Sequence, residues 1–283
     1  MNYWEVSLMD CQIKITDNKA VWKIQAALAL IFLLNPFLGV LSTLFFVFVS
    51  KEKSMAFYLV IILTLFMWCL QSTRSFHLGE PSDWAGNYYY NFHNAAITDT
   101  LTYLFFTTKE YAWQAFNLIG YYLFDGDFLS YANFIVALTY MFTFAAIYKF
   151  WNYIQADPRF LVASLCLFAF VTEVNGICNN LLRQQFAMSM MLYAIIERCT
   201  NGRILYPLLV ISFFTHTMTG FFIPFLFIRL GKKASFRFYI YIVLGFGLLY
   251  ILFTNLSIFS SSSFYAFQRL ATASNAVSYT HLR

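Results

Sequence analysis

The stretch NNLLRQQFAMSMMLYAII, residues 179–196, decides the fold of this chain, because it is a hydrophobic run of membrane-helix length that opens with an arginine. An arginine at the bilayer centre costs roughly 2.5–3.5 kcal/mol on insertion scales, so Arg183 needs an anion and marks a candidate functional site. Asn180 lies three residues before Arg183 and Gln184 directly follows it, so a helix gathers the three side chains at one end. The stretch therefore predicts a membrane helix with an anion site at its start.

The composition of the whole chain is that of a polytopic membrane protein. Of its 283 residues, 60% are hydrophobic and only 11% are charged, whereas soluble domains carry about 25% charged residues. Aromatic residues make up 22%, which suits lipid-facing helices and interfacial belts. The net charge of +5 comes from short basic clusters between hydrophobic runs. Such clusters are topology signals, so we expect no nucleic-acid partner.

Several hydrophobic runs approach the ~20 residues that cross the hydrocarbon layer as a helix. We therefore expect an all-α, polytopic transmembrane bundle that forms a single integral domain over residues 1–256. The expected spans are residues 26–49 with a kink at Asn35-Pro36, 55–71, 129–151, 160–174, 181–196 and 238–255.

Residues 204–228 form another hydrophobic run, and basic clusters bracket it on both sides. Because basic loops stay in the cytoplasm, both ends of this run should be cytoplasmic. Two arms of about twelve residues are each too short to cross the bilayer. This pattern predicts a re-entrant hairpin with its break at Thr215-His216-Thr217. The alternative is one ordinary helix with a misplaced basic cluster.

Residues 72–127 are too long and too polar at their start to be a simple turn between spans. Their acidic residues oppose the basic turn at Lys51 and Lys53, which places the segment outside. Its many Tyr, Phe and Trp residues argue against disorder. We expect an ordered external loop with amphipathic helices that lie against the membrane.

The two ends of the chain and its cysteines say less about fold and function. Residues 1–25 lack the pattern of a cleavable signal peptide, and the five scattered cysteines are expected to be free thiols. Residues 257–283 end in VSYTHLR, which resembles translated adapter sequence. We therefore expect that this C-terminal segment belongs to a truncated reading frame.

Motifs of soluble enzymes are missing from the sequence, and polar residues of the predicted outer face are the remaining candidates. Asp83 opens DWAGNYYYNF, residues 83–92. Its carboxylate suits orientation or deprotonation of a sugar hydroxyl, and the rings of Tyr88 and Tyr89 suit stacking on sugars. Alternatively, Asp83 caps a helix and the tyrosines belong to the interfacial belt.

Arg183 and His216 are the other two candidates. A guanidinium beside Asn180 and Gln184 in the first turn of a helix favours a phosphate group. Alternatively, Arg183 reaches a lipid headgroup or pairs with Glu173. His216 lies among threonines in a hydrophobic run and suits proton transfer, unless it is a packing group. No Cys or carboxylate stands at metal-ligand spacing, so we expect no metal and no other cofactor.

In their order, these motifs resemble the EpsG-like membrane proteins of exopolysaccharide clusters, which are related to Wzy-type polymerases. The resemblance covers roughly Phe57 to Phe227, although STR replaces the usual helix exit and TM replaces the Ser-Ala that follows the histidine. The positions that match the family pattern are Arg74, Gly79, Asp83, Tyr88 or Tyr89, Glu110, Arg183, Gln184 and His216.

The resemblance implies polymerisation of polyprenyl-diphosphate-linked oligosaccharide repeats at the outer face of a bacterial cytoplasmic membrane, beside other polysaccharide-synthesis membrane proteins. Arg183 would then hold the diphosphate, and His216, Asp83 or Glu110 would take the proton of the acceptor hydroxyl. A membrane carrier of lipid-linked or free glycans is the main alternative, and a scaffold is a third. The expected substrate contacts are Arg74, Tyr88, Tyr89, Asn180 and Gln184.

Overall fold

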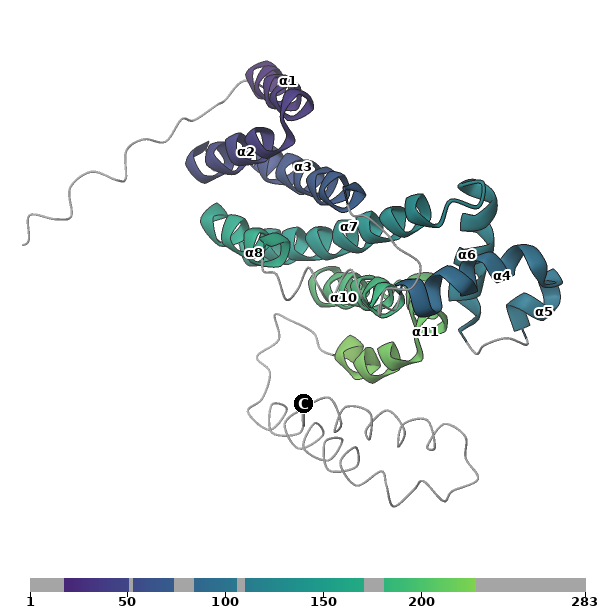
Figure 1. Cartoon of the computed structure of the whole chain (residues 1–283). Helices are drawn as coiled ribbons and strands as arrows, with labels where there is room; N and C mark the ends of the chain where they lie inside the picture. The colour runs from purple at the N-terminus through teal and green to yellow at the C-terminus, as the bar shows by residue number, and fades with distance from the viewer. Residues whose placement is uncertain (1–17, 51–52, 74–83, 106–109, 171–180, 228–283) are drawn as a thin grey trace, which may run out of the picture. The chain divides into compact units, whose positions relative to one another are not determined.

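The computed structural model describes residues 18–50, 53–73, 84–105, 110–170 and 181–227 (Figure 1). All of them belong to one compact unit, Met1–Arg229, whereas a second unit, Leu230–Arg283, and the expected span 238–255 lie outside the described residues. Every element of the described part is helical, as predicted. The elements are α1 (Asn18–Leu34), α2 (Pro36–Ser50), α3 (Lys53–Ser72), the π-helix η1 (Trp84–Tyr88), α4 (Tyr89–Ile97), α5 (Thr100–Phe105), α6 (Tyr111–Leu123), α7 (Phe128–Ile154), α8 (Pro158–Phe170), α10 (Leu182–Asn201), α11 (Tyr206–Thr215) and the 3₁₀ helix η2 (Thr217–Phe227).

The first expected span, residues 26–49, is in fact two helices, so the predicted kink is a full break between α1 and α2. Pro36 has no backbone N–H and begins α2, where that donor would lack a helical partner in any case. The side chain of Asn35 accepts a hydrogen bond from the backbone N of Leu38 at 3.1 Å, as a helix N-cap does. The pair therefore ends one helix and starts the next.

Helix α7 is central to the described helices, because α3 and α10 both pack along it and α8 follows it (Figure 1). The side chain of Asp127 caps its start by accepting a hydrogen bond from the backbone N of Leu129 at 3.0 Å. The interface is built from large apolar side chains such as Leu63, Phe144 and Phe186, all buried. These helices correspond to the expected spans 55–71, 129–151 and 181–196.

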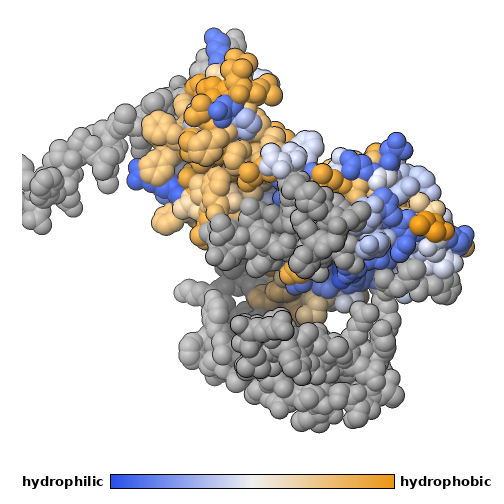
Figure 2. Space-filling model, viewed as in Figure 1, coloured by the Kyte–Doolittle hydropathy of each residue, from blue (hydrophilic) through white to orange (hydrophobic). Residues whose placement is uncertain are grey.

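Exposed apolar side chains are frequent on the described helices. By length and composition, two described helices, Ser54–Ser72 and Phe128–Ile154, could cross a membrane, and five further apolar helices are shorter. Figure 2 shows hydrophobic residues over the outer surface of α1–α3, where Leu34 and Phe45 are among the exposed side chains. Such a surface is stable in lipid and would associate in water.

Helices α4, α5 and α6 belong to the expected external segment and gather at the N-terminal end of α7 (Figure 1). Helix α6 has an inverted distribution of polarity. It buries the amides of Gln114 and Asn117, whereas Ile119, Tyr122 and Leu123 are exposed. A helix in water shows the opposite arrangement, so this pattern supports the expectation that α6 lies against lipid.

Helix α11 and η2 form a hairpin with its break at His216, where the backbone is extended. The run 204–228 is therefore not one unbroken helix. Arg198 Nε donates a hydrogen bond to the carbonyl of Leu226 at 3.0 Å, so η2 ends beside the C-terminal end of α10, from which the chain leads into α11. Helix α11 has only 10 residues, about 15 Å at 1.5 Å per residue. Both ends of the hairpin thus lie at one end of α10, and its position in a membrane stays a prediction.

Candidate active site

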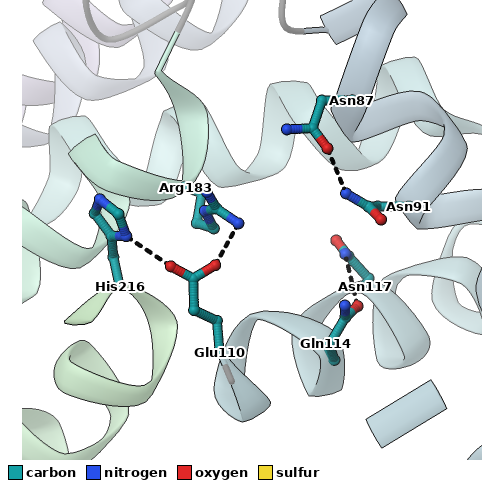
Figure 3. A network of polar contacts seen from close by, with 7 residues as sticks. All are labelled: Asn87, Asn91, Glu110, Gln114, Asn117, Arg183 and His216. Carbon is teal, nitrogen blue, oxygen red and sulfur yellow. Dashed lines mark hydrogen bonds and ion pairs between the residues drawn. The ribbon is translucent and has the colours of Figure 1, made fainter. Parts of the chain in front are cut away.

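Glu110 contacts the other two candidate residues of the site, Arg183 and His216 (Figure 3). It directly precedes α6 but makes no capping hydrogen bond to that helix, because its carboxylate points to two other elements. Oε2 forms an ion pair with the Arg183 guanidinium, and Oε1 lies 2.8 Å from Nδ1 of His216. The structure thus brings together three residues that are far apart in the sequence.

Each of the three residues is held at the end of a helix. Arg183 lies in the first turn of α10, where the positive end of the helix dipole and free backbone N–H groups attract anions. His216 lies at the break between α11 and η2, and α11 is tied to α10 by the hydroxyl of Ser212, which donates to the carbonyl of Ala187 at 2.8 Å. The ends of three helices, α6, α10 and α11, therefore meet at the carboxylate of Glu110.

The three side chains are mostly shielded from solvent, with 14% of Glu110, 23% of Arg183 and 15% of His216 exposed. Shielding strengthens electrostatic interactions, because the effective dielectric constant is lower than in water. The Nε atom of Arg183 is buried and has no hydrogen-bond partner among the described residues. The guanidinium therefore has a donor that the described protein does not use.

The contact to Glu110 defines which nitrogen of His216 can act as a base. An ionised carboxylate accepts hydrogen bonds, so the neutral imidazole places its hydrogen on Nδ1, which faces Oε1. The lone pair is then on Nε2. This is the arrangement in which a carboxylate orients an imidazole for proton transfer.

Comparison with known proteins gives the family. A sequence model of the EpsG family matches residues 57–279, a range that contains all three residues of this site. The chain belongs to the EpsG family. Neither a curated protein nor a solved structure matches it. The EpsG match and the apolar helices together indicate a membrane protein of exopolysaccharide biosynthesis.

The structure does not place every predicted residue of this EpsG protein at the site. Tyr88, an expected substrate contact, is only 5% exposed and packs against Trp113 with 5.8 Å between ring centroids. Tyr89 is partly buried, and its ring packs against that of His93 with 4.2 Å between ring centroids. Gln184 is partly buried in the first turn of α10, next to Arg183. The predicted residues that lie outside the described part of the chain are Arg74, Asp83, Glu173 and Asn180.

The sequence interpretation missed a set of amides near Glu110. Gln114 and Asn117 follow Glu110 by four and seven residues and are both 1% exposed. On α4 and the preceding η1, Asn91 donates a hydrogen bond to Asn87 at 2.7 Å (Figure 3). The signal was available, because polar residues at this spacing mark one face of a helix in the otherwise apolar run EYAWQAFN.

Proposed function

We propose that this EpsG protein joins polyprenyl-diphosphate-linked oligosaccharide repeats into a polymer by glycosyl transfer at the outer face of the cytoplasmic membrane. The observation that carries the proposal is the contact of one carboxylate, Glu110, with both Arg183 and His216. Glycosyl transfer from a diphosphate needs a cation at the leaving group and a base at the acceptor. Arg183 supplies the cation, and His216 supplies the base.

In the proposed step, a hydroxyl oxygen of the acceptor sugar attacks the anomeric carbon of the donor. The hydroxyl proton passes to Nε2 of His216, and the bond between the anomeric carbon and the diphosphate oxygen breaks. The electron pair of that bond stays on the polyprenyl diphosphate, whose developing charge the guanidinium of Arg183 stabilises. Glu110 stabilises the imidazolium that forms, as the carboxylate of a catalytic triad does.

The ion pair with Glu110 does not occupy all the hydrogen-bond donors of Arg183. A guanidinium has five N–H donors in a planar fork that suits phosphate oxygens. The ion pair engages one terminal nitrogen of Arg183, and 23% of the side chain is exposed. The first turn of α10 adds the positive end of the helix dipole. Arg183 can therefore contact a diphosphate while it stays paired with Glu110.

The test is His216→Ala in the full-length protein within its own synthesis cluster. Loss of the base should stop joining without stopping delivery, so single lipid-linked repeats should accumulate on the outer face. A sugar-specific probe on intact cells detects these repeats, and chromatography of lipid extracts shows their size. His93→Ala is the matched control, because it removes a partly buried histidine from α4, outside the site.

Each result separates the proposal from its alternatives. Single repeats outside in His216→Ala, with full polymer in His93→Ala, support the polymerase. Repeats trapped on the cytoplasmic side in His216→Ala would instead identify a carrier. Full-length polymer made by His216→Ala would rule out this histidine as the base.

A further inference from the structure

The exposed side of α6 carries an open groove, where the start of α5 lies beside it. The groove has a volume of about 590 Å³ and is lined by Thr100, Leu118, Ile119, Tyr122 and Leu123, which we call the α6 groove. Neither α5 nor α6 contains a charged residue. Small-molecule sites have volumes of roughly 300–1,000 Å³ and mostly apolar linings. The α6 groove therefore has room for a segment of a hydrocarbon chain.

The groove is connected to the Glu110 site along one face of α6. Tyr111 directly follows Glu110, and Ala115, Leu118 and Tyr122 follow Tyr111 by four, seven and eleven residues, which is the spacing of one helix face. Tyr111 and Tyr122 are exposed, and the two residues between them are partly exposed. An accessible apolar stripe thus runs from the site to the groove, over about 17 Å at 1.5 Å per residue.

An aromatic cluster forms the start of this stripe. The ring of Tyr111 packs against Phe105 of α5 and Phe214 of α11, with 5.8 Å between ring centroids in each pair. All three rings are exposed. Phe214 precedes His216 by two residues, and Tyr111 follows Glu110 by one. Exposed apolar surface therefore begins directly beside the charged site.

We propose that the stripe and the α6 groove bind the polyprenyl chain of the donor substrate. The inference rests on the proposed function, because that function places the donor's diphosphate at Arg183. In the donor, only the diphosphate separates the polyprenyl chain from the bond that breaks, so the chain leaves the protein close to the site. In the acceptor, a whole oligosaccharide repeat separates the chain from the reacting hydroxyl. Apolar surface next to the site therefore suits the chain of the donor.

The diphosphate gives the donor chain an advantage over other lipids in the groove. Lipid tails are as apolar as the groove, so a chain gains no hydrophobic free energy when it moves there from the bilayer. A diphosphate held at Arg183 tethers its chain beside the groove and raises the effective concentration of the chain there. A phospholipid lacks that tether. The groove should therefore hold the donor chain in preference to phospholipid.

The first test is photo-crosslinking of the purified full-length protein in nanodiscs that contain the lipid-linked repeat. Photoreactive benzoylphenylalanine replaces Ile119 in the groove or, as a matched control, Leu33 on α1, because both positions are exposed. A sugar-specific probe on the protein band detects captured repeats. Position 119 should capture the lipid-linked repeat, and position 33 should capture phospholipid only. Excess inorganic pyrophosphate should suppress the capture at position 119, because it competes with the donor's diphosphate at Arg183.

The second test varies the length of the donor chain. Ile119→Ala combined with Leu123→Ala should raise the KM for the natural donor about fivefold at unchanged kcat, because the groove binds the chain equally before and during transfer. The KM for a donor with a ten-carbon isoprenoid chain, which is too short to fill the groove, should stay the same. Leu33→Ala combined with Leu34→Ala is the control and should change neither KM, because both leucines are exposed on α1.

The outcomes keep this inference apart from the proposed function. Capture of phospholipid alone at position 119, capture that pyrophosphate does not suppress, or an equal rise of KM for both donors would overturn the groove as the donor's chain site. The polymerase proposal would still stand if His216→Ala stops joining. Capture of the repeat at position 119 together with full polymer in His216→Ala would keep the groove and overturn His216 as the base.

Discussion

The carboxylate of Glu110 lies 2.8 Å from the imidazole of His216, across 106 residues of sequence. The contact joins the start of α6 to the break between α11 and η2. The same carboxylate forms an ion pair with Arg183 at the start of α10. One side chain thus couples the predicted anion site to the predicted base, and its substitution should affect both.

We expect Glu110→Gln to lower the rate of polymer formation by at least about 100-fold, within the range for a lost general base. A neutral amide lacks the negative charge that stabilises an imidazolium and forms the ion pair with the guanidinium. The rate is measured as polymer formed per purified protein from lipid-linked repeats.

The coupling of Glu110 to His216 has its own measurement, a double-mutant cycle. If Glu110 acts through His216, Glu110→Gln combined with His216→Ala should be no slower than the slower single variant, because the two residues work as a unit. Fully additive losses would show that Glu110 acts independently of the histidine.

Arg183→Lys should lose most activity although it keeps the positive charge. Lysine carries a compact ammonium and cannot form the planar fork that binds two phosphate oxygens. Membrane extraction and a melting curve check that the variant folds. A Lys variant with full activity would reduce Arg183 to a simple positive charge. A variant that fails to fold would assign the Glu110 ion pair a structural role.

The predicted topology places α4 outside and the start of α3 inside. A single cysteine introduced as Ala96→Cys, at an exposed position of α4 in a cysteine-free background, should react with an impermeant maleimide on intact cells. Ser54→Cys, at an exposed position of α3, should react only after permeabilisation. The opposite labelling pattern would invert the topology and move the candidate site to the cytoplasm.

The ion pair between Lys149 of α7 and Glu197 of α10 should matter for stability. Because Glu197 is buried, Lys149→Met leaves a carboxylate without its cation and should destabilise the protein by about 3–5 kcal/mol. Lys149→Met combined with Glu197→Met should recover much of that loss. Thermal unfolding in one detergent compares the variants. A double variant less stable than Lys149→Met would show that the carboxylate has another role.

The sequence predicted the class of the fold and the break at His216. Long apolar runs indicate membrane helices wherever they lie in the chain, because crossing the hydrocarbon layer depends on local length and composition. The helices over the expected spans 55–71 and 129–151 follow from that rule, whereas α10, over the expected span 181–196, is not among the described helices that are long and apolar enough to cross a membrane. The break between α1 and α2 exceeded the expected kink, because the strength of the Asn35 cap depends on a side-chain conformation that the sequence does not specify.

For the candidate site, the sequence by itself singled out Arg183 and His216, each with an alternative structural role, and the resemblance to the EpsG-like proteins added Glu110. Charged residues and histidines stand out in an apolar sequence. Because they are costly to bury in a membrane, they mark candidate sites. Only the tertiary structure decided that Arg183 pairs with Glu110, that Tyr88 belongs to the core, and that the amides of Gln114 and Asn117 on α6 are buried. These contacts join residues from different helices, so they depend on helix packing and not on local sequence.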